Sequence, residues 1–157
     1  MQENSASSRP LQESLILPCG ATLANRIAKA AMTEGLATAD GLSDGGAGML
    51  LSGNIQVDAD HLERPGNVVI DREPNEQMKA ALASWAQAGT RQGNHFWAQI
   101  SHAGRQTQSN VNPHPKAPSA VKLGLPGGQF GGPVALTEAE IQDLVGRFAL
   151  CARAIKE

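Results

Sequence analysis

The order of elements between Gly48 and Ile100 constrains the fold of this chain more than any other feature. Gly48–Leu51 is a compact apolar run, typical of a strand in a parallel sheet covered on both faces. Apolar residues that recur at helical spacing after Asn75, a residue typical of an N-cap, predict an amphipathic helix that Gly93 ends. Phe96–Ile100 follows as the next strand. Strand, loop, helix and strand form one βαβ unit, which predicts an α/β fold.

The chain before this unit is expected to begin with a mobile tail and to enter the sheet afterwards. Residues 1–14 are polar and have little to bury, so they cannot recover their ordering entropy. Leu15–Leu17 and Ala21–Leu23 flank a Pro-Cys-Gly turn, which predicts a hairpin. Ile27–Met32 is predicted to be the first core strand. The connection from it to Gly48 is rich in glycine and shows no helical period, although parallel crossovers usually contain a helix.

The region after the βαβ unit predicts a long loop and a final helix. Asn110–Pro133 is rich in proline and ends in clustered glycines, which favour an ordinary loop over a phosphate cradle because no strand precedes them. Loops of this length are usually functional or mobile, and a lid over a site would fit. Thr137 and Glu140 have the spacing of a capping box. A broad apolar face from Ile141 to Ile155 predicts a helix that must pack on another surface.

The composition is that of a soluble globular protein and disfavours several classes of function. Apolar residues make up 41% of the 157 residues, and a formal charge of −2 without long charged runs argues against nucleic-acid and membrane-surface binding. A small-molecule partner is expected instead. No segment approaches the roughly 18 apolar residues of a membrane span, and residues 1–10 do not resemble a signal peptide, so the cytoplasm is expected. Cys19 and Cys151 lack metal-ligand spacing, which predicts free thiols and no metal site.

A polar cluster at the end of Phe96–Ile100 supplies the first site candidates. Ligands of α/β proteins gather where strands end, because loops project side chains there from a fixed sheet. Gln99, His102 and Arg105 lie in this position. The polar loop His61–Asn67 is expected to be solvated rather than to face a ligand.

Six short motifs occur in order along the chain. They are Leu23–Ile27, Ala31–Thr33, Gly48–Asn54, Gln99–Arg105, Ala117–Ser119 and Leu136–Ile141. Together they resemble the Old Yellow Enzyme family, the FMN-dependent NADH:flavin oxidoreductases. The resemblance implies an incomplete TIM (β/α)8 barrel, of which residues 15–157 form the N-terminal, FMN-binding part. It also implies an enzyme that passes hydride from NAD(P)H through FMN to an electron-poor alkene or related acceptor.

The resemblance implies roles for individual residues. Gln99 matches the glutamine that contacts the pyrimidine edge of the flavin, a role that suits a carboxamide because it both donates and accepts hydrogen bonds. Thr33 is expected to hydrogen-bond the flavin C4 oxygen and to tune the ring. Ala31, Met32 and Asn54 match positions that line the flavin mainly through backbone and packing.

A structural alternative remains open for each polar candidate. Gln99 would then satisfy nearby backbone groups, and Thr33 would cap the end of its strand. His102 is equally compatible with a site role and a structural one. For Arg105 a structural ion pair is slightly favoured over a place in the flavin-side polar network. Neither His102 nor Arg105 is expected to be catalytic.

Two departures from the family pattern limit what the chain is expected to do alone. Where relatives carry the first crossover helix, only Leu42-Ser43-Asp44 remains, so that helix is expected to be deleted. The catalytic acid, the substrate-binding residues and the phosphate-binding residues are expected beyond Glu157. A complete barrel needs about 200 to 250 residues. The alternative function is therefore a truncated, non-catalytic fragment with weak or no flavin binding, and self-association into a homo-oligomer would also fit. An unrelated α/β binding domain is the third hypothesis.

Overall fold

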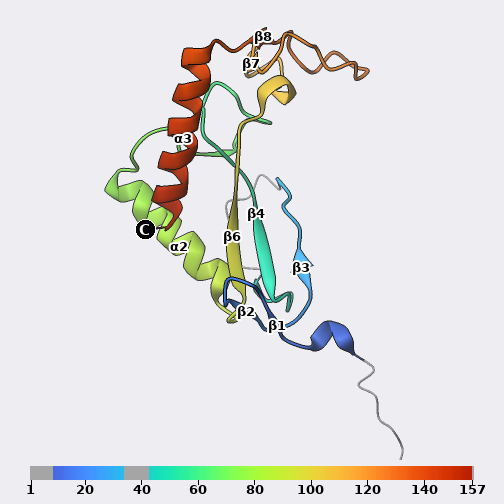
Figure 1. Ribbon diagram of the computed structural model, residues 1–157, viewed down its shortest axis with the longest axis vertical. Helices are drawn as coiled ribbons and strands as arrows, with labels where there is room; N and C mark the ends of the chain where they lie inside the picture. The colour runs from blue at the N-terminus through green and yellow to red at the C-terminus, as the bar shows by residue number, and fades with distance from the viewer. Residues whose placement is uncertain (1–8, 34–42, 157) are drawn as a thin grey trace, which may run out of the picture.

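A parallel sheet with two helices on one face forms the body of the protein, as the computed structural model shows (Figure 1). The structure describes residues 9–33 and 43–156. In chain order its elements are η1 (Pro10–Gln12), β1 (Leu15–Ile16), β2 (Thr22–Leu23), β3 (Ala28–Lys29), β4 (Met49–Gln56), β5 (Val68–Val69), α2 (Glu76–Thr90), β6 (His95–Ser101), η2 (Gly104–Gln106), β7 (Lys116–Ala117), β8 (Val134–Ala135) and α3 (Glu138–Lys156).

β4 is the central strand of the main sheet. β6 runs parallel to it along one edge, and α2 connects the two, so the predicted βαβ unit is confirmed. On the other edge, β3 pairs with the beginning of β4 and β5 pairs with its end, both in parallel. The α/β architecture with a parallel sheet is therefore as predicted.

A bulge interrupts β4 at Ser52-Gly53, where the pairing with β6 shifts register between Leu51 and Asn54. The glycine is needed because a Cβ at Gly53 would lie 2.7 Å from the carbonyl oxygen of Met32. The chain that follows β3 thus passes directly against the bulge. This close approach brings Thr33 next to Asn54.

Both predicted helices begin as their sequences indicate. The Asn75 side chain accepts a hydrogen bond from the backbone N–H of Met78 at 2.9 Å, which caps α2. At α3, the Thr137 N–H donates to Glu140 Oε2 at 2.7 Å and the Glu140 N–H donates to Thr137 Oγ1 at 3.3 Å, so the capping box is confirmed. Gly93, with φ of 75°, lies in the turn between α2 and β6.

The core lies between the sheet and the two helices. Its fully buried members are Ile55, Val57, Ile70 and Cys151, and α2, β6 and α3 contribute partly buried side chains around them. Cys151 and the exposed Cys19 are both free thiols, as predicted. Burial raises the pKa of Cys151 to about 11, so this thiol is neutral and acts as a small apolar side chain.

The strands differ in length from the prediction. β3 covers only Ala28–Lys29 rather than Ile27–Met32, because its ladder with β4 ends where the bulge begins. β4 instead continues beyond Leu51 to Gln56, with polar side chains on the face away from the helices. β5 was not predicted, since two valines after a Pro-Gly turn carry little strand signal. The hairpin β1–β2 is confirmed, with Leu15 opposite Leu23.

The loop Asn110–Pro133 is irregular, as predicted, and it folds back on itself. An isolated bridge joins Gln108 to Phe130, and the loop contains one short strand that was not predicted, β7, which pairs in parallel with β8 directly after the loop. These contacts bring the start of α3 close to the chain that follows η2 (Figure 1).

The apolar face of α3 is wider than the surface that it covers. Leu144 and Ile155 pack into the core, as expected, and so does Cys151, which is not part of the predicted face. Ile141, Val145 and Phe148 remain exposed, and Val145 keeps 59% of its accessible surface. The expectation that the whole face packs is therefore only partly right. Among the described residues, no helix is both long and apolar enough to cross a membrane.

Two expectations concern segments that are only partly described. The deleted crossover helix falls largely on residues 34–42, which lie outside the described residues. Of the expected tail, residues 1–8 also lie outside them. Within the described part, η1 forms a single turn, and the carbonyl oxygen of Leu11 accepts a hydrogen bond from the Arg26 N–H at 2.9 Å. The mobility of the tail stays a prediction.

Candidate functional site

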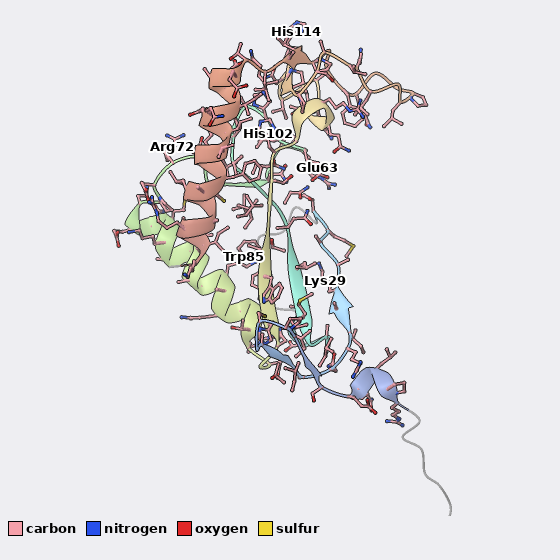
Figure 2. All side chains as sticks on the ribbon, viewed as in Figure 1. Lys29, Glu63, Arg72, Trp85, His102 and His114 are labelled. Carbon is pink, nitrogen blue, oxygen red and sulfur yellow. The ribbon has the colours of Figure 1, made fainter. Side chains whose placement is uncertain are left out.

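Four polar side chains meet on the face of the sheet opposite the helices, and we call them the inner-face network: Thr33, Asn54, Glu63 and Gln99. Ile55 and Ile100 point into the core, so the preceding residues on the same strands point to the other face. The network joins the chain after β3 to β4, β6 and the loop between β4 and β5. In Figure 2, Glu63 lies away from α2 and α3, near the segment that follows β3.

The hydrogen bonds of the network converge on one carboxylate oxygen. Asn54 Nδ2 donates to Glu63 Oε2 at 2.5 Å, and Thr33 Oγ1 donates to the same oxygen at 2.7 Å. Gln99 Nε2 donates to Asn54 Oδ1. The Asn54 N–H also points to Thr33 Oγ1 at 3.4 Å. Three predicted site residues are therefore linked through a fourth, Glu63, that sequence reasoning missed.

Local backbone geometry holds these side chains in place. The bulge leaves Ser52 Oγ free to accept the Gln99 N–H at 2.9 Å, which replaces a missing ladder bond. Glu63 is held by a tight turn in which the Arg64 N–H donates to Asn67 Oδ1 at 2.9 Å and Gly66 adopts φ of 89°. The sequence signal for Glu63 is its place in the polar loop directly after the strand that carries Asn54.

Glu63 is ionised in this arrangement. Burial raises the pKa of its carboxyl, but the hydrogen bonds from Thr33 and Asn54 and the charge of Arg64 outweigh burial, and the pKa lies below its ordinary value. The Glu63 side chain keeps 32% of its accessible surface. The network is thus a half-exposed polar surface and not a buried one.

The remaining predicted cofactor-binding residues lie beside this network. Ala31 and Met32 directly precede Thr33, and Met32 is 54% exposed. The single proton of the Thr33 hydroxyl is directed at Glu63. Donation from Thr33 to a flavin C4 oxygen, as the resemblance implies, would require that hydroxyl to turn away from Glu63.

The residues fit the pyrimidine edge of a flavin by the chemistry of their donors and acceptors. Within the described part of the chain, Gln99 Oε1 accepts no hydrogen bond, and one of the two Nε2 protons is also free. These two atoms offer an acceptor and a donor side by side. Two residues beyond Asn54 on the same face, Gln56 is fully buried, and its amide has no partner among the described residues.

A second polar group, the Asp58 cluster, lies near the ends of the same strands and consists of Asp58, His61, His102 and Arg147. His61 Nδ1 lies 3.2 Å and His102 Nε2 lies 4.0 Å from Asp58 Oδ2, and the two imidazoles stack with centroids 4.6 Å apart. Arg147 of α3 donates to Asp58 Oδ2 at 3.2 Å. The cluster therefore ties α3 to the loop after β4.

The histidine tautomers argue against metal binding by this cluster. His61 Nε2 accepts the Lys116 N–H at 2.8 Å, and His102 Nδ1 accepts the Gly104 N–H at 3.1 Å. In a neutral imidazole the other nitrogen then carries the proton, so both nitrogens that face Asp58 lack a lone pair for a cation. The Asp58, His61 and His102 atoms are close enough for a metal site, but their protonation does not suit one.

Titration of the cluster supports a structural role for His102. The pKa of His102 is lowered to about 4, chiefly by burial and also by the charges of a protonated His61 and of Arg147, against the opposing effect of Asp58. For Asp58, burial raises the pKa, but hydrogen bonding to His61 and Asp60 and the charges of His61 and Arg147 hold it at about 2. At neutral pH the cluster holds a neutral His102 beside an ionised Asp58.

Arg105 belongs to neither group. It lies in η2, is exposed, and forms no ion pair with another described residue. The structural ion pair favoured for Arg105 is therefore not present in the described part of the chain.

Comparison with known proteins adds to this geometry. No family model matches the sequence. The chain is similar to the NADH-dependent flavin oxidoreductase iliE of Hypocrea jecorina (strain QM6a), at 31% identity over an alignment of 166 residues that covers 88% of this chain and 41% of that protein.

Two solved structures resemble the fold. A 2-naphthoyl-CoA reductase in complex with 2-naphthoyl-CoA has a TM-score of 0.80 at 18% identity, over 94% of this chain and 26% of that chain. An Old Yellow Enzyme homologue from Zymomonas mobilis has a TM-score of 0.74 at 26% identity, over 92% of this chain and 44% of that chain. The chain thus spans less than half the length of each of these relatives.

Proposed function

Because this chain belongs to the Old Yellow Enzyme family of NADH:flavin oxidoreductases, we propose that it forms part of an FMN site in an NAD(P)H-dependent oxidoreductase. The similarity to a flavin oxidoreductase and to an Old Yellow Enzyme homologue supports the family that the six motifs predict. Since the chain spans less than half of these proteins, the activity is proposed for a larger assembly. In it, residues 15–157 form the N-terminal part of a (β/α)8 barrel.

The inner-face network is the observation that carries this proposal. It gathers Thr33, Asn54 and Gln99 on one face of a parallel sheet, through hydrogen bonds to Glu63. Gln99 has a free acceptor and a free donor for the pyrimidine edge of FMN. Thr33 and Asn54 line the ring, and the backbone at Ala31 and Met32 packs beside it.

Bound FMN supplies hydride transfer from NAD(P)H to an electron-poor alkene or related small-molecule acceptor. The role of this chain is to bind and orient the pyrimidine end of the cofactor. No catalytic residue is assigned to the described part of the chain.

Titration of the purified chain with FMN, followed by quenching of flavin fluorescence, tests the proposal. We expect saturable quenching and co-elution of FMN with the protein on gel filtration. The absence of both at protein concentrations well above the micromolar range would reject an autonomous flavin site.

A second candidate function is a non-catalytic fragment with weak or no flavin binding. It is favoured by the exposed apolar side chains of Ile141, Val145 and Phe148 on α3 and by the outer edge of β6, which no other described strand covers. Such surfaces promote association. A chain that elutes as a large oligomer and does not quench FMN fluorescence would support this candidate over the first.

A further inference from the structure

Glu63 is the one member of the inner-face network that can only accept hydrogen bonds. Its carboxylate has no proton when ionised, whereas the amides of Asn54 and Gln99 and the hydroxyl of Thr33 both donate and accept. Glu63 Oε2 accepts hydrogen bonds from Thr33 Oγ1 and Asn54 Nδ2, and Glu63 Oε1 lies 3.6 Å from Arg64 Nη2. The hydrogen bonds between side chains of the network therefore take their direction from Glu63.

The orientation of each amide side chain in the network determines the orientation of the next. Asn54 must turn its Nδ2 toward Glu63, which leaves its Oδ1 on the opposite side. Gln99 must then turn its Nε2 toward that oxygen. A reversed Gln99 would place two amide oxygens in contact. The charge on Glu63 thus determines which atoms of Gln99 remain free, although the two residues exchange no hydrogen bond.

We propose that Glu63 is a positioning residue that fixes the amide orientations of Asn54 and Gln99, so that Gln99 presents Oε1 and one N–H to a ligand edge with a donor beside an acceptor. The inference rests on the flavin site proposed above, because the pyrimidine edge of FMN has this chemistry. Glu63 itself does not touch the ligand. Its effect reaches the ligand through Asn54.

The same arrangement changes the role of Thr33. The Thr33 proton is engaged by Glu63, and the Asn54 N–H points to the Thr33 oxygen at 3.4 Å. Thr33 therefore presents a lone pair to the ligand and not a proton. A ligand group that donates a hydrogen bond is favoured next to Thr33.

Substitutions that reverse donors and acceptors test the proposal. Glu63→Ala removes the acceptor, and Glu63→Gln keeps the shape but permits both amide orientations. Asn54→Asp places two carboxylates side by side. The double variant Asn54→Asp with Glu63→Gln restores complementarity, because the new carboxylate accepts from both neighbours and Gln99 keeps its orientation. Glu76→Gln, at a side chain that is 91% exposed, is the matched control.

The first readout is the heteronuclear NMR spectrum of the side-chain amides in the chain without FMN. In the native chain we expect the two Nε2 protons of Gln99 to be well separated, since one of them is hydrogen-bonded. They should approach the positions of an exposed glutamine, such as Gln87, in Glu63→Ala. The double variant and Glu76→Gln should resemble the native chain. Unchanged Gln99 resonances in Glu63→Ala and Glu63→Gln would overturn the proposal.

The second readout is the affinity for FMN in fluorescence titrations. We expect a loss of about tenfold in Glu63→Ala, a smaller loss in Glu63→Gln, and recovery in the double variant. If the native chain binds FMN and Glu63→Ala binds equally well, the role of Glu63 is rejected and the flavin site stands. If the native chain does not bind FMN, the autonomous flavin site fails, and the amide spectra alone decide whether Glu63 orients Gln99. Should Glu63→Ala not fold, Glu63→Gln and the double variant decide the same question.

Discussion

The inner-face network and the Asp58 cluster are both built around a carboxylate of the loop after β4, yet they differ in what they leave free. The Asp58 side chain keeps 14% of its accessible surface, and its histidines are fixed by backbone N–H groups and stacked on each other. In the inner-face network, Gln99 retains a free acceptor and a free donor on a half-exposed surface. The first arrangement stabilises the fold, and the second is suited to a ligand.

The largest difference that we expect between the two regions is in how much each contributes to the free energy of unfolding. Asp58→Ala removes the more buried of the two carboxylates that contact Arg147 and the one that faces both histidines, so we expect the free energy of unfolding to fall by about 2 to 4 kcal/mol. Urea denaturation followed by circular dichroism measures this loss. Asp143→Ala is the control, because it removes the exposed carboxylate that also contacts Arg147, and should cost less than about 1 kcal/mol. Equal losses in the two variants would remove the distinction between the two regions.

The pH dependence of stability should follow the Asp58 cluster. The folded pKa of His102 is about 4, below its ordinary value of 6.5, so the unfolded chain binds a proton more readily. Stability from this residue is complete above pH 6.5 and is lost as pH falls toward 4, by about 1 to 3 kcal/mol. Asp58, held at about 2, adds a further loss below pH 3.8.

Urea unfolding at a series of pH values checks this profile. In His102→Gln the free energy of unfolding should change little with pH between 6.5 and 4. His114→Gln, at an exposed histidine that Figure 2 labels far from the core, should leave the pH dependence as in the native chain. A profile that His102→Gln leaves unchanged would show that the titrating group lies elsewhere.

A methyl group added at Gly53 should disturb the inner-face network by displacing the segment that carries Thr33. In Gly53→Ala the new Cβ would lie 2.7 Å from the Met32 carbonyl oxygen, so the segment carrying Thr33 must move. We expect a loss of about 1 to 3 kcal/mol in thermal or urea unfolding. Gly132→Ala, whose new Cβ would meet no side chain or backbone atom of another segment within 4 Å, should be nearly neutral. A neutral Gly53→Ala would argue against the close approach of the chain after β3 to β4.

The smallest expected effect on stability is that of Glu63→Ala. Its carboxylate is partly solvated and its partners can turn to water, so we expect a loss below about 1 kcal/mol, in contrast to Asp58→Ala. The same denaturation experiment compares the two variants directly. A loss as large as that of Asp58→Ala would mean that Glu63 serves mainly the fold.

Sequence patterns predicted correctly those elements that depend on contacts between residues close together in the chain. The cap at Asn75, the capping box of Thr137 and Glu140 and the βαβ order depend on residues close together in sequence, and all three are confirmed. The extension of β4 through its bulge was missed. It depends on the packing of Met32 against Gly53, which are distant in sequence.

The candidate site was predicted in its residues but not in its connections. Gln99 was a candidate from its place at a strand end and received its role from family resemblance, whereas Thr33 and Asn54 were assigned by the resemblance alone. The structure brings the three together. Glu63 was grouped with a solvated loop, since a charged residue beside Pro and Gly gives no sign of its partners. His102 remained ambiguous for the same reason, because its role depends on the Asp58 cluster, which forms only in the folded chain.

The affinity of the chain for FMN, compared between Gln99→Ala and Gln87→Ala, tests the central claim most directly. Both variants lose the same side chain, but Gln99 lies in the inner-face network and Gln87 lies exposed on α2. We predict that the native chain and Gln87→Ala bind FMN alike and that Gln99→Ala binds about tenfold more weakly. Equal affinity of all three proteins for FMN would contradict the placement of a flavin at this face of the sheet.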